Sequence, residues 1–288
     1  MTENRSQWGV GSNQYQKRPG TTGTDRVSHK TLSGDRQIVD DRSDATGITW
    51  NSDALDLSAF KQMETRRAVA RFRARIVGHV WDAAALEGNP ITLPEVQTLL
   101  EGVTVQGRKL TDEQQVLALA ESTNLVADLV EHNEFELSKP ISDRIHYLVA
   151  RHEAIEAGHF RGQGSVNGGG LVRMGELGDY QASESGEGAK ILIAEYDSAI
   201  KYLKTEVEHP AEQAMVYFMV GAYRQFYFDG NKRTSRLNMN GHLLANGYDA
   251  ISIPAARRLE FNEHLRSLFY EADGTDLIVF IADCLPKD

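Results

Sequence analysis

The chain has 288 residues and carries 31 Lys and Arg against 41 Asp and Glu, which gives a formal net charge of −10 at pH 7. This acidic balance disfavours nucleic acid or an anionic membrane as the partner of the whole protein. Hydrophobic residues at 41% and charged residues at 25% are typical of a soluble globular protein with a real core.

Residues 1–48 are polar and contain few large aliphatic side chains. Such a segment cannot bury enough apolar surface to offset chain entropy, so we predict a disordered arm, with a docked arm as the alternative. The first 20 residues do not resemble a secretory signal, and no apolar run approaches a membrane span. The single cysteine, Cys284, permits no intrachain disulfide and is interpreted as a small core residue. We therefore expect a cytoplasmic protein.

Residues 49–110 are expected to form an N-terminal helical region. Apolar side chains recur at helical spacing between Leu55 and Leu86, and Gly88 marks the end of this helix. The arginines between residues 66 and 75 are interpreted as a solvated face whose long stems cover apolar surface.

A short helix is predicted at residues 92–102, because Thr92 can cap it and an acid follows in its first turn. The next helix is expected to begin at a capping box that starts with Thr111. Residues 158–188 are rich in glycine and contain a short apolar run at 171–174, which favours a functional loop or a β-hairpin. The remaining helices are predicted at residues 138–158, 190–206, 210–224, 233–246, 255–272 and 276–285. The fold class is therefore mostly α, with one small hairpin at most.

The most informative segment is residues 225–236, which joins two apolar helices through a short polar loop. Arg233 and Arg236 are three residues apart and therefore lie on one face of a helix. Gly230 allows a close backbone approach, and the amide groups at the start of the following helix favour an anion. This pattern indicates a polyphosphate site in which both arginines bind phosphate oxygens.

Asp229 fits the same interpretation, because its carboxylate can hold a Mg²⁺ ion that bridges two phosphates. The alternative is an ordinary helix–turn–helix corner, in which Asp229 is a helix cap and the arginines lie on a solvated face. Short motifs have many false positives, so the residues alone leave both interpretations open.

The segment resembles the signature of the Fic/Doc (Fido) family, which usually reads His-Pro-Phe-x-Asp/Glu-Gly-Asn-Gly/Lys-Arg-x-x-Arg. Six positions match in order: Asp229, Gly230, Asn231, Lys232, Arg233 and Arg236. The resemblance implies a Fic core with C-terminal helices at residues 111–288 and a small β-hairpin flap. It also implies transfer of AMP from ATP to a hydroxyl group of a target protein.

The resemblance further implies a role for each matched residue. Asn231 would hold the α-phosphate, Arg233 the β-phosphate region, and Arg236 the γ-phosphate or an inhibitory glutamate. Asp229 would hold Mg²⁺. Gly230 and Lys232 complete the implied nucleotide-binding set.

A second resemblance concerns the end of the first predicted helix. Residues 86–89, Leu-Glu-Gly-Asn, are similar to the inhibitory helix of the family, in its N-terminal type. This implies that Glu87 pairs with Arg236 and keeps the γ-phosphate out of position, for which an Arg–carboxylate pair has suitable geometry. Ala83 stands where the family has Ser or Thr, which puts the usual hydrogen bond of that helix in doubt. The alternative is that Glu87 is only a last-turn acid before a glycine.

The sequence departs from the family at the catalytic base, because Gln225 stands where the family has a histidine. A glutamine amide cannot accept the proton of the target hydroxyl, and loss of a general base costs about two to four decades in rate, roughly 3–5 kcal/mol. Three interpretations stay open. The chain is an impaired or redirected adenylyltransferase, an inactive nucleotide-sensitive regulatory or interaction module, or an enzyme that uses another base.

The glycine run at residues 168–170 does not match a dinucleotide-binding fingerprint, since Asn167 stands where a third glycine is needed. The resemblance suggests instead that residues 171–174 belong to a flap that binds the target backbone by strand addition, and a mobile loop is the alternative. His146, His152 and His159 lack the spacing of a zinc site and are expected on a helix surface or in the core.

A regulatory protein that binds nucleic acid through residues 66–75 is the competing class, and the net charge argues against it. The expected ligands are therefore ATP or a related nucleotide with Mg²⁺. The expected partner is an unidentified target protein, with no membrane involved and homodimerisation left open.

Overall fold

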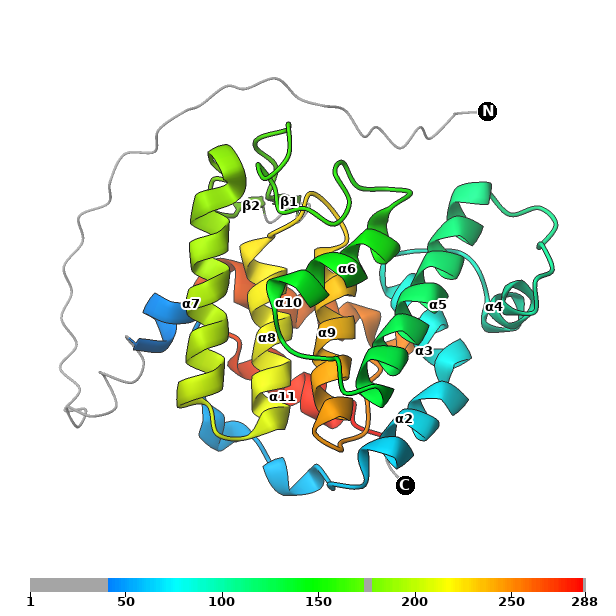
Figure 1. Cartoon of the computed structure of the whole chain (residues 1–288), viewed down its shortest axis with the longest axis horizontal. Helices are drawn as coiled ribbons and strands as arrows, with labels where there is room; N and C mark the ends of the chain where they lie inside the picture. Colours follow the sequence, from blue (N-terminus) through cyan, green and yellow to red (C-terminus); the bar gives the residue numbers. More distant parts are fainter. Residues whose placement is uncertain (1–40, 174–177, 287–288) are drawn as a thin grey trace.

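Two neighbouring helices, α8 (Pro210–Arg224) and α9 (Asn231–Ala245), lie at the centre of the computed structural model (Figure 1). The structure describes residues 41–173 and 178–286. Most side chains of α8 are buried, because the helix is apolar along most of its length. Helix α9 is buried as deeply but carries many polar side chains. Residues 225–230 form the loop between them. The motif therefore lies in this loop and in the first turns of α9, at the centre of the fold.

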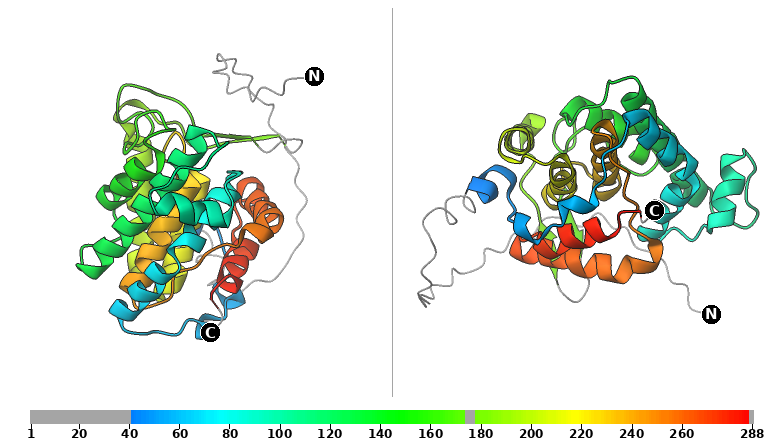
Figure 2. Two further views of the ribbon diagram at one scale, coloured as in Figure 1. Left: turned by 90° about the vertical axis from the view of Figure 1, so that its right-hand side faces the viewer. Right: turned by 90° about the horizontal axis from the view of Figure 1, so that it is seen from below.

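Other helices pack around this central pair. Helix α7 (Lys190–Glu206) packs against α8, whereas α5 (Leu110–Glu131) and α6 (Lys139–Ala150) pack against α9. Helices α10 (Arg258–Glu271) and α11 (Thr275–Asp283) contact α8 and cover the face opposite α6 (Figure 2). The fold is therefore mostly α, as predicted.

The predicted single helix from Leu55 to Leu86 is wrong, because the chain forms two helices there. These are α2 (Thr65–Ala74) and α3 (Ile76–Leu86), separated by Arg75, whose φ of −107° and ψ of 10° interrupt the helix.

The residues before α2 form two short 3-10 turns, η1 (Ser52–Ala54) and η2 (Leu57–Ala59). In each turn the preceding side chain, Asn51 or Asp56, accepts a hydrogen bond from a backbone amide two residues later. Such local bonds compete with a continuous helix.

Helix α4 (Leu93–Leu100) is capped as predicted, since the Glu95 carboxylate accepts a hydrogen bond from the Thr92 amide. The capping box predicted at Thr111 is not used, because α5 begins one residue earlier and has Lys109 at its N-cap.

The predicted helix over residues 138–158 is too long, because α6 ends at Ala150 and turns follow it. The predicted start of α9 is two residues late. Two 3-10 turns, η4 (Glu187–Ala189) and η5 (Ala255–Arg257), lead into α7 and α10.

The glycine-rich segment contains the expected hairpin. Strands β1 (Leu171–Arg173) and β2 (Asp179–Gln181) pair antiparallel, with Val172 opposite Tyr180. The hairpin lies at the end of the helical bundle that also carries the loop between α8 and α9 (Figure 1).

The predicted N-terminal arm falls largely outside the described residues, which begin at residue 41. Residues 41–46 are helical, and Thr46 and Ile48 are fully buried. Thr49 forms a parallel bridge with Asp273, next to α11. The packed part of the chain therefore begins before residue 49, where we placed the boundary.

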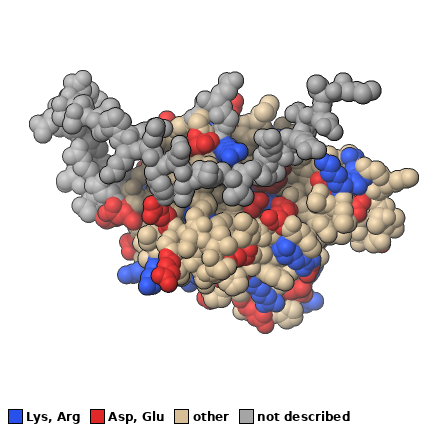
Figure 3. Space-filling model, turned by 90° about the horizontal axis from the view of Figure 1, so that it is seen from above, with Lys and Arg blue, Asp and Glu red and all other residues tan. Residues whose placement is uncertain are grey.

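Within residues 41–173 and 178–286, no helix combines the length and the apolar character needed to cross a bilayer. Figure 3 shows the face that is turned upward in Figure 1. In its described part, acidic and basic side chains are interspersed among uncharged ones.

Candidate functional site

The loop between α8 and α9 reverses the chain through two residues in the left-handed region. Gln225 has φ 50° and ψ 55° and ends α8, whereas Gly230 has φ 72° and starts α9. A side chain at residue 230 would be strained at this φ and would also approach the Ala150 Cβ to 3.1 Å. The glycine of the motif is therefore required by both backbone conformation and packing.

The side chain of Asn231 braces this loop from inside. Its Oδ1 accepts a hydrogen bond from the Tyr227 amide at 2.8 Å, and its Nδ2 donates to the Tyr227 carbonyl at 2.8 Å. The same Nδ2 donates to Oε1 of Gln225 at 3.0 Å, while Nε2 of Gln225 donates to the Ala222 carbonyl at 2.6 Å. Both amides are thus held by the loop and by the end of α8.

His146 supports the loop from below. Its Nε2 donates to the Asp229 carbonyl at 2.9 Å, its Nδ1 accepts from the Gly158 amide at 2.8 Å, and its ring stacks on Tyr227 with centroids 3.7 Å apart. Burial, together with the charge of Arg233, lowers the pKa of His146 to about 4, so the imidazole is neutral at pH 7. The sequence predicted only that this histidine lies on a surface or in the core.

Glu87 lies between two cations of the motif. Its Oε1 is 3.2 Å from Nη2 of Arg236, and its Oε2 is 3.1 Å from Nζ of Lys232. Burial acts to raise the pKa of the Glu87 carboxyl, but the charges of Lys232 and Arg236 outweigh it and lower this pKa to about 2. The carboxylate is therefore ionised at pH 7. Arg236 also donates to the carbonyl of Ala83 at 3.3 Å, so this position contributes a backbone contact where the family has a hydroxyl side chain.

Arg233 is paired with an acid that the sequence analysis missed. Its Nη1 and Nη2 donate to Oε1 and Oε2 of Glu153 at 2.9 and 2.7 Å. Oε1 of Glu153 also accepts from Gln115, whose own Oε1 accepts from Asn89. A hydrogen-bonded chain thus connects Arg233 to the segment that follows Glu87. In the sequence, nothing connected Glu153 to Arg233.

Asp229 is the exposed acid of the site, with 51% of its side chain accessible. Its Oδ1 accepts from the Gly230 amide at 2.5 Å and lies 3.4 Å from Nη2 of Arg233. Among the described residues, no group of three or more His, Cys, Asp or Glu side chains is arranged to hold a metal ion. One exposed carboxylate fits Mg²⁺, which is usually held by one or two carboxylates together with substrate phosphates.

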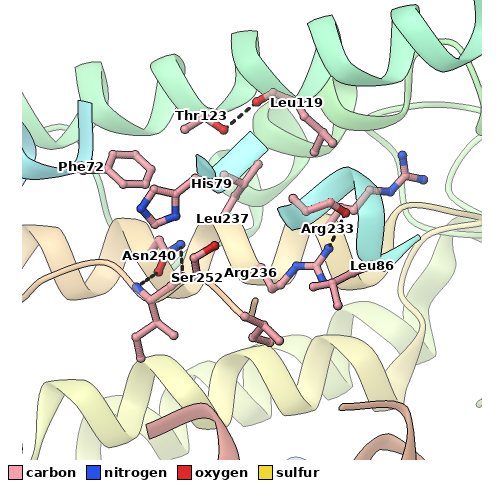
Figure 4. Close-up of a pocket in the computed structure, with 13 residues that line it drawn as sticks. Phe72, His79, Leu86, Leu119, Thr123, Arg233, Arg236, Leu237, Asn240 and Ser252 are labelled. Atoms are coloured by element: carbon pink, nitrogen blue, oxygen red, sulfur yellow. Dashed lines mark hydrogen bonds between the residues drawn. The ribbon is translucent and has the colours of Figure 1, made fainter. Parts of the chain in front are cut away.

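A cavity of about 30 Å³ lies behind the arginines, between α3, α5 and α9 (Figure 4). Arg233, Arg236, His79 and Asn240 are among the residues that line it. Nε and Nη1 of Arg236 are buried and have no hydrogen-bond partner in the described part of the chain. The cavity has room for a water molecule but not for a nucleotide. Only the open side of the motif, where Asp229 is exposed, is therefore accessible to a larger ligand.

The three cations of the motif lie at the start of α9, and two acids from outside the motif pair with them. Lys232 and Arg236 share Glu87, and Arg233 is bound to Glu153. Helix amides, guanidinium groups and one exposed carboxylate are the groups that recognise a polyphosphate with its metal ion. The structure brings together all eight residues predicted for the site and adds Glu153 and His146.

A scan against models of known protein families finds no match to the chain. Among curated proteins, it is 29% identical over 256 residues to the protein adenylyltransferase Fic of Aedes aegypti, covering 87% of this chain and 48% of that protein. It is 28% identical over 248 residues to the protein of the same name from Culex quinquefasciatus, covering 81% and 47%. The chain thus spans about half the length of these curated relatives.

Solved structures with Fic domains have the same fold. A Fic domain containing signalling protein from Bacteroides thetaiotaomicron matches with a TM-score of 0.62 at 17% identity, covering 88% of this chain and 92% of that one. Residues 134–508 of Fic-1 from C. elegans match with a TM-score of 0.60 at 19% identity, covering 88% and 69%.

Proposed function

Since the chain belongs to the Fic family, we propose that it binds ATP or a related nucleotide at the start of α9, in a site that Glu87 holds inactive. The observation that carries this proposal is the Glu87–Arg236 pair at 3.2 Å. A carboxylate at that distance occupies Nη2 of the guanidinium, to which a terminal phosphate would otherwise bind. Bound nucleotide must therefore displace Glu87 from Arg236.

The chemistry that we propose is the transfer of AMP from ATP to a protein, because the curated relatives are named protein adenylyltransferases. We take the acceptor to be a hydroxyl group of the target. The hydroxyl oxygen forms a bond to the α-phosphorus, and the bond from this phosphorus to the oxygen that bridges to the β-phosphate breaks. Pyrophosphate leaves with that electron pair, and the hydroxyl proton needs an acceptor. Arg233 and Arg236 would stabilise charge on the phosphates. Asp229 would hold Mg²⁺, which neutralises phosphate charge when it is bound.

The proposed reaction lacks an evident proton acceptor, because residue 225 is a glutamine. A neutral amide orients a hydroxyl but does not take its proton. We therefore propose that transfer is slow in the native chain and that His at residue 225 would increase it.

A second candidate function, an inactive nucleotide-sensitive module, is favoured by the hydrogen bonds of Gln225. Its amide donates to the Ala222 carbonyl and accepts from Asn231, so the side chain acts as a brace of the loop. In this case nucleotide binding would alter the Glu87 contact and thereby the surface offered to a partner, without any transfer.

Protein labelling from α-labelled ATP in a lysate distinguishes the two candidates. The variants are the native chain, Glu87→Gly, and Glu87→Gly combined with Gln225→His. Label with Glu87→Gly alone indicates a transferase that uses another proton acceptor. Label only after His is restored indicates an intact nucleotide site that no longer transfers. If no variant labels protein or binds Mg-ATP, the proposal is wrong.

A further inference from the structure

Arg161 is a fully buried arginine on the loop that follows α6, with none of its side chain accessible. The charge of Glu195 acts on it, but none of its hydrogen bonds within the described residues goes to a carboxylate. Its guanidinium instead donates to three backbone carbonyls. Nε bonds to Gln225 at 2.5 Å, Nη1 to Gly168 at 2.9 Å, and Nη2 to Ser183 at 3.0 Å.

These three carbonyls belong to the hairpin and to the motif loop, which are distant in the sequence. Gly168 lies just before β1 and Ser183 just after β2, so they mark the two legs of the hairpin. Gln225 is the base position of the motif. The backbone amide of Arg161 also donates to the Phe226 carbonyl at 2.9 Å. One residue therefore ties both legs of the hairpin to the first two residues of the motif.

The glycine run that resembled no nucleotide loop is explained by this contact. Gly169 and Gly170 have φ of 73° and 79°, and a Cβ at Gly170 would lie 2.7 Å from Cζ of Arg161. A Cβ at Gly169 would lie 2.9 Å from both Arg161 and Phe228 of the motif. The glycines therefore let the hairpin backbone lie directly on the guanidinium and on the motif loop.

The leg of the hairpin that follows β2 has a second connection to the motif. The Ser183 hydroxyl donates to Oε1 of Glu195 at 2.6 Å, and this oxygen also accepts from Nη1 of Arg224 at 2.8 Å. Arg224 is the last residue of α8 and directly precedes Gln225. Gln225 is in the left-handed region, which a residue other than glycine adopts only when its surroundings hold it there.

We propose that Arg161 is a positioning residue, which holds the hairpin at a fixed distance from residue 225 so that a target bound to the hairpin presents its hydroxyl to the base position. The proposal rests on the proposed function for the role of the target. A planar guanidinium reaches three carbonyls in different directions, whereas the single ammonium of lysine is a point charge on a flexible stem. Lysine therefore preserves the charge at residue 161 and loses the geometry.

The test compares Arg161→Lys with Leu119→Ala, a core substitution in α5 that lowers global stability without touching the hairpin. Hydrogen exchange is measured in peptides that cover residues 178–183 and 225–230 and in peptides from α5. We expect Arg161→Lys to accelerate exchange in the first two segments by about tenfold and to leave α5 unchanged, because local opening is set by local bonds. Leu119→Ala should accelerate exchange in all three segments.

A second readout separates positioning from stability. In the background of Glu87→Gly with Gln225→His, Arg161→Lys should lower the maximum rate of protein labelling and leave the KM for ATP unchanged. Equal acceleration of exchange in α5 and in the hairpin would overturn the proposal, as would unchanged exchange in the hairpin.

If Arg161→Lys does not fold, Gly170→Ala is the alternative variant. Its Cβ pushes the hairpin away from the guanidinium, so it must accelerate exchange in the same two segments and not in α5. Failure of the parent to bind Mg-ATP would refute the proposed function, whereas the exchange result would still decide whether Arg161 holds the hairpin.

Discussion

Glu153 and Arg233 form a bidentate ion pair, with N–O distances of 2.9 and 2.7 Å. Arg233 lies one helical turn before Arg236, which pairs with Glu87. The Arg233 side chain is only 4% accessible, whereas that of Glu153 is 26% accessible. The bond to Glu153 raises the pKa of Arg233 although burial acts to lower it. Two acids from separate segments thus occupy the cations that phosphates would contact.

We predict that Glu153→Gln strengthens Mg-ATP binding. The substitution removes a carboxylate that competes with phosphate for Arg233, and in a Glu87→Gly background we expect a gain of about tenfold, or about 1.4 kcal/mol. Without nucleotide the same variant should be less stable, because a buried guanidinium loses its partner. Calorimetry measures the affinity and thermal unfolding measures the stability.

Glu121→Gln is the matched control for Glu153→Gln. Glu121 pairs with Arg151 on the surface, at a side chain that is 50% accessible, so its loss should change neither measurement appreciably. Weaker Mg-ATP binding by Glu153→Gln would contradict the prediction and would indicate that Glu153 orients Arg233 toward the nucleotide.

Asp229→Asn should reduce the dependence of nucleotide binding on metal. Asparagine keeps an acceptor for the Gly230 amide but loses the charge that Mg²⁺ needs. In the Glu87→Gly background we expect Asp229→Asn to lower the affinity for Mg-ATP about tenfold. When a chelator removes the metal, the substitution should have little effect on the affinity for ATP. Asp276→Asn, which changes an acid in the first turn of α11, is the control. An equal loss with and without Mg²⁺ would show that Asp229 supports the loop rather than the metal.

Acid should destabilise the fold before its carboxylates are protonated. Burial lowers the pKa of His79, His146 and His242 from 6.5 to about 4. Between pH 6.5 and 4 the unfolded chain binds protons that the folded chain does not, so stability is full above pH 6.5 and falls as pH decreases. Each histidine contributes at most roughly 3 kcal/mol.

His146→Gln tests this assignment at the site. It should reduce the pH dependence of the unfolding free energy by one proton in this range, as measured by urea unfolding at several pH values. His132→Gln, which changes an exposed histidine, should keep the native dependence. The assignment is wrong if His146→Gln keeps it too.

The sequence predicted the helices around the motif well because the local signals there agree with the packing. Residues 190–206 and 210–224 are helical over the predicted ranges. The predicted helix from Leu55 to Leu86 failed because apolar spacing does not reveal a break at Arg75 or the side-chain caps of the short turns. These depend on local hydrogen bonds that periodicity does not report.

Apart from Glu87, which the family resemblance supplied, the site was predictable where it is contiguous in the chain and not where it is assembled by the fold. The motif residues from Gln225 to Arg236 lie in one loop and one helix. Glu153 and Arg161 come from the loop after α6, at positions whose local sequence carries no signal for a phosphate site. In the sequence, only the glycines at residues 168–170 indicated the contact with Arg161. They are needed because the hairpin backbone lies against the guanidinium in the folded chain.

The most direct test of the account is a calorimetric titration of Mg-ATP into the native chain, Glu87→Gly and Glu101→Gly. Glu87 and Glu101 stand in the same Leu-Glu-Gly context and each caps the end of a helix, but only Glu87 contacts the motif. The account predicts at least about tenfold tighter binding for Glu87→Gly and native affinity for Glu101→Gly. Absence of Mg-ATP binding by Glu87→Gly, or an equal gain from Glu101→Gly, would contradict it.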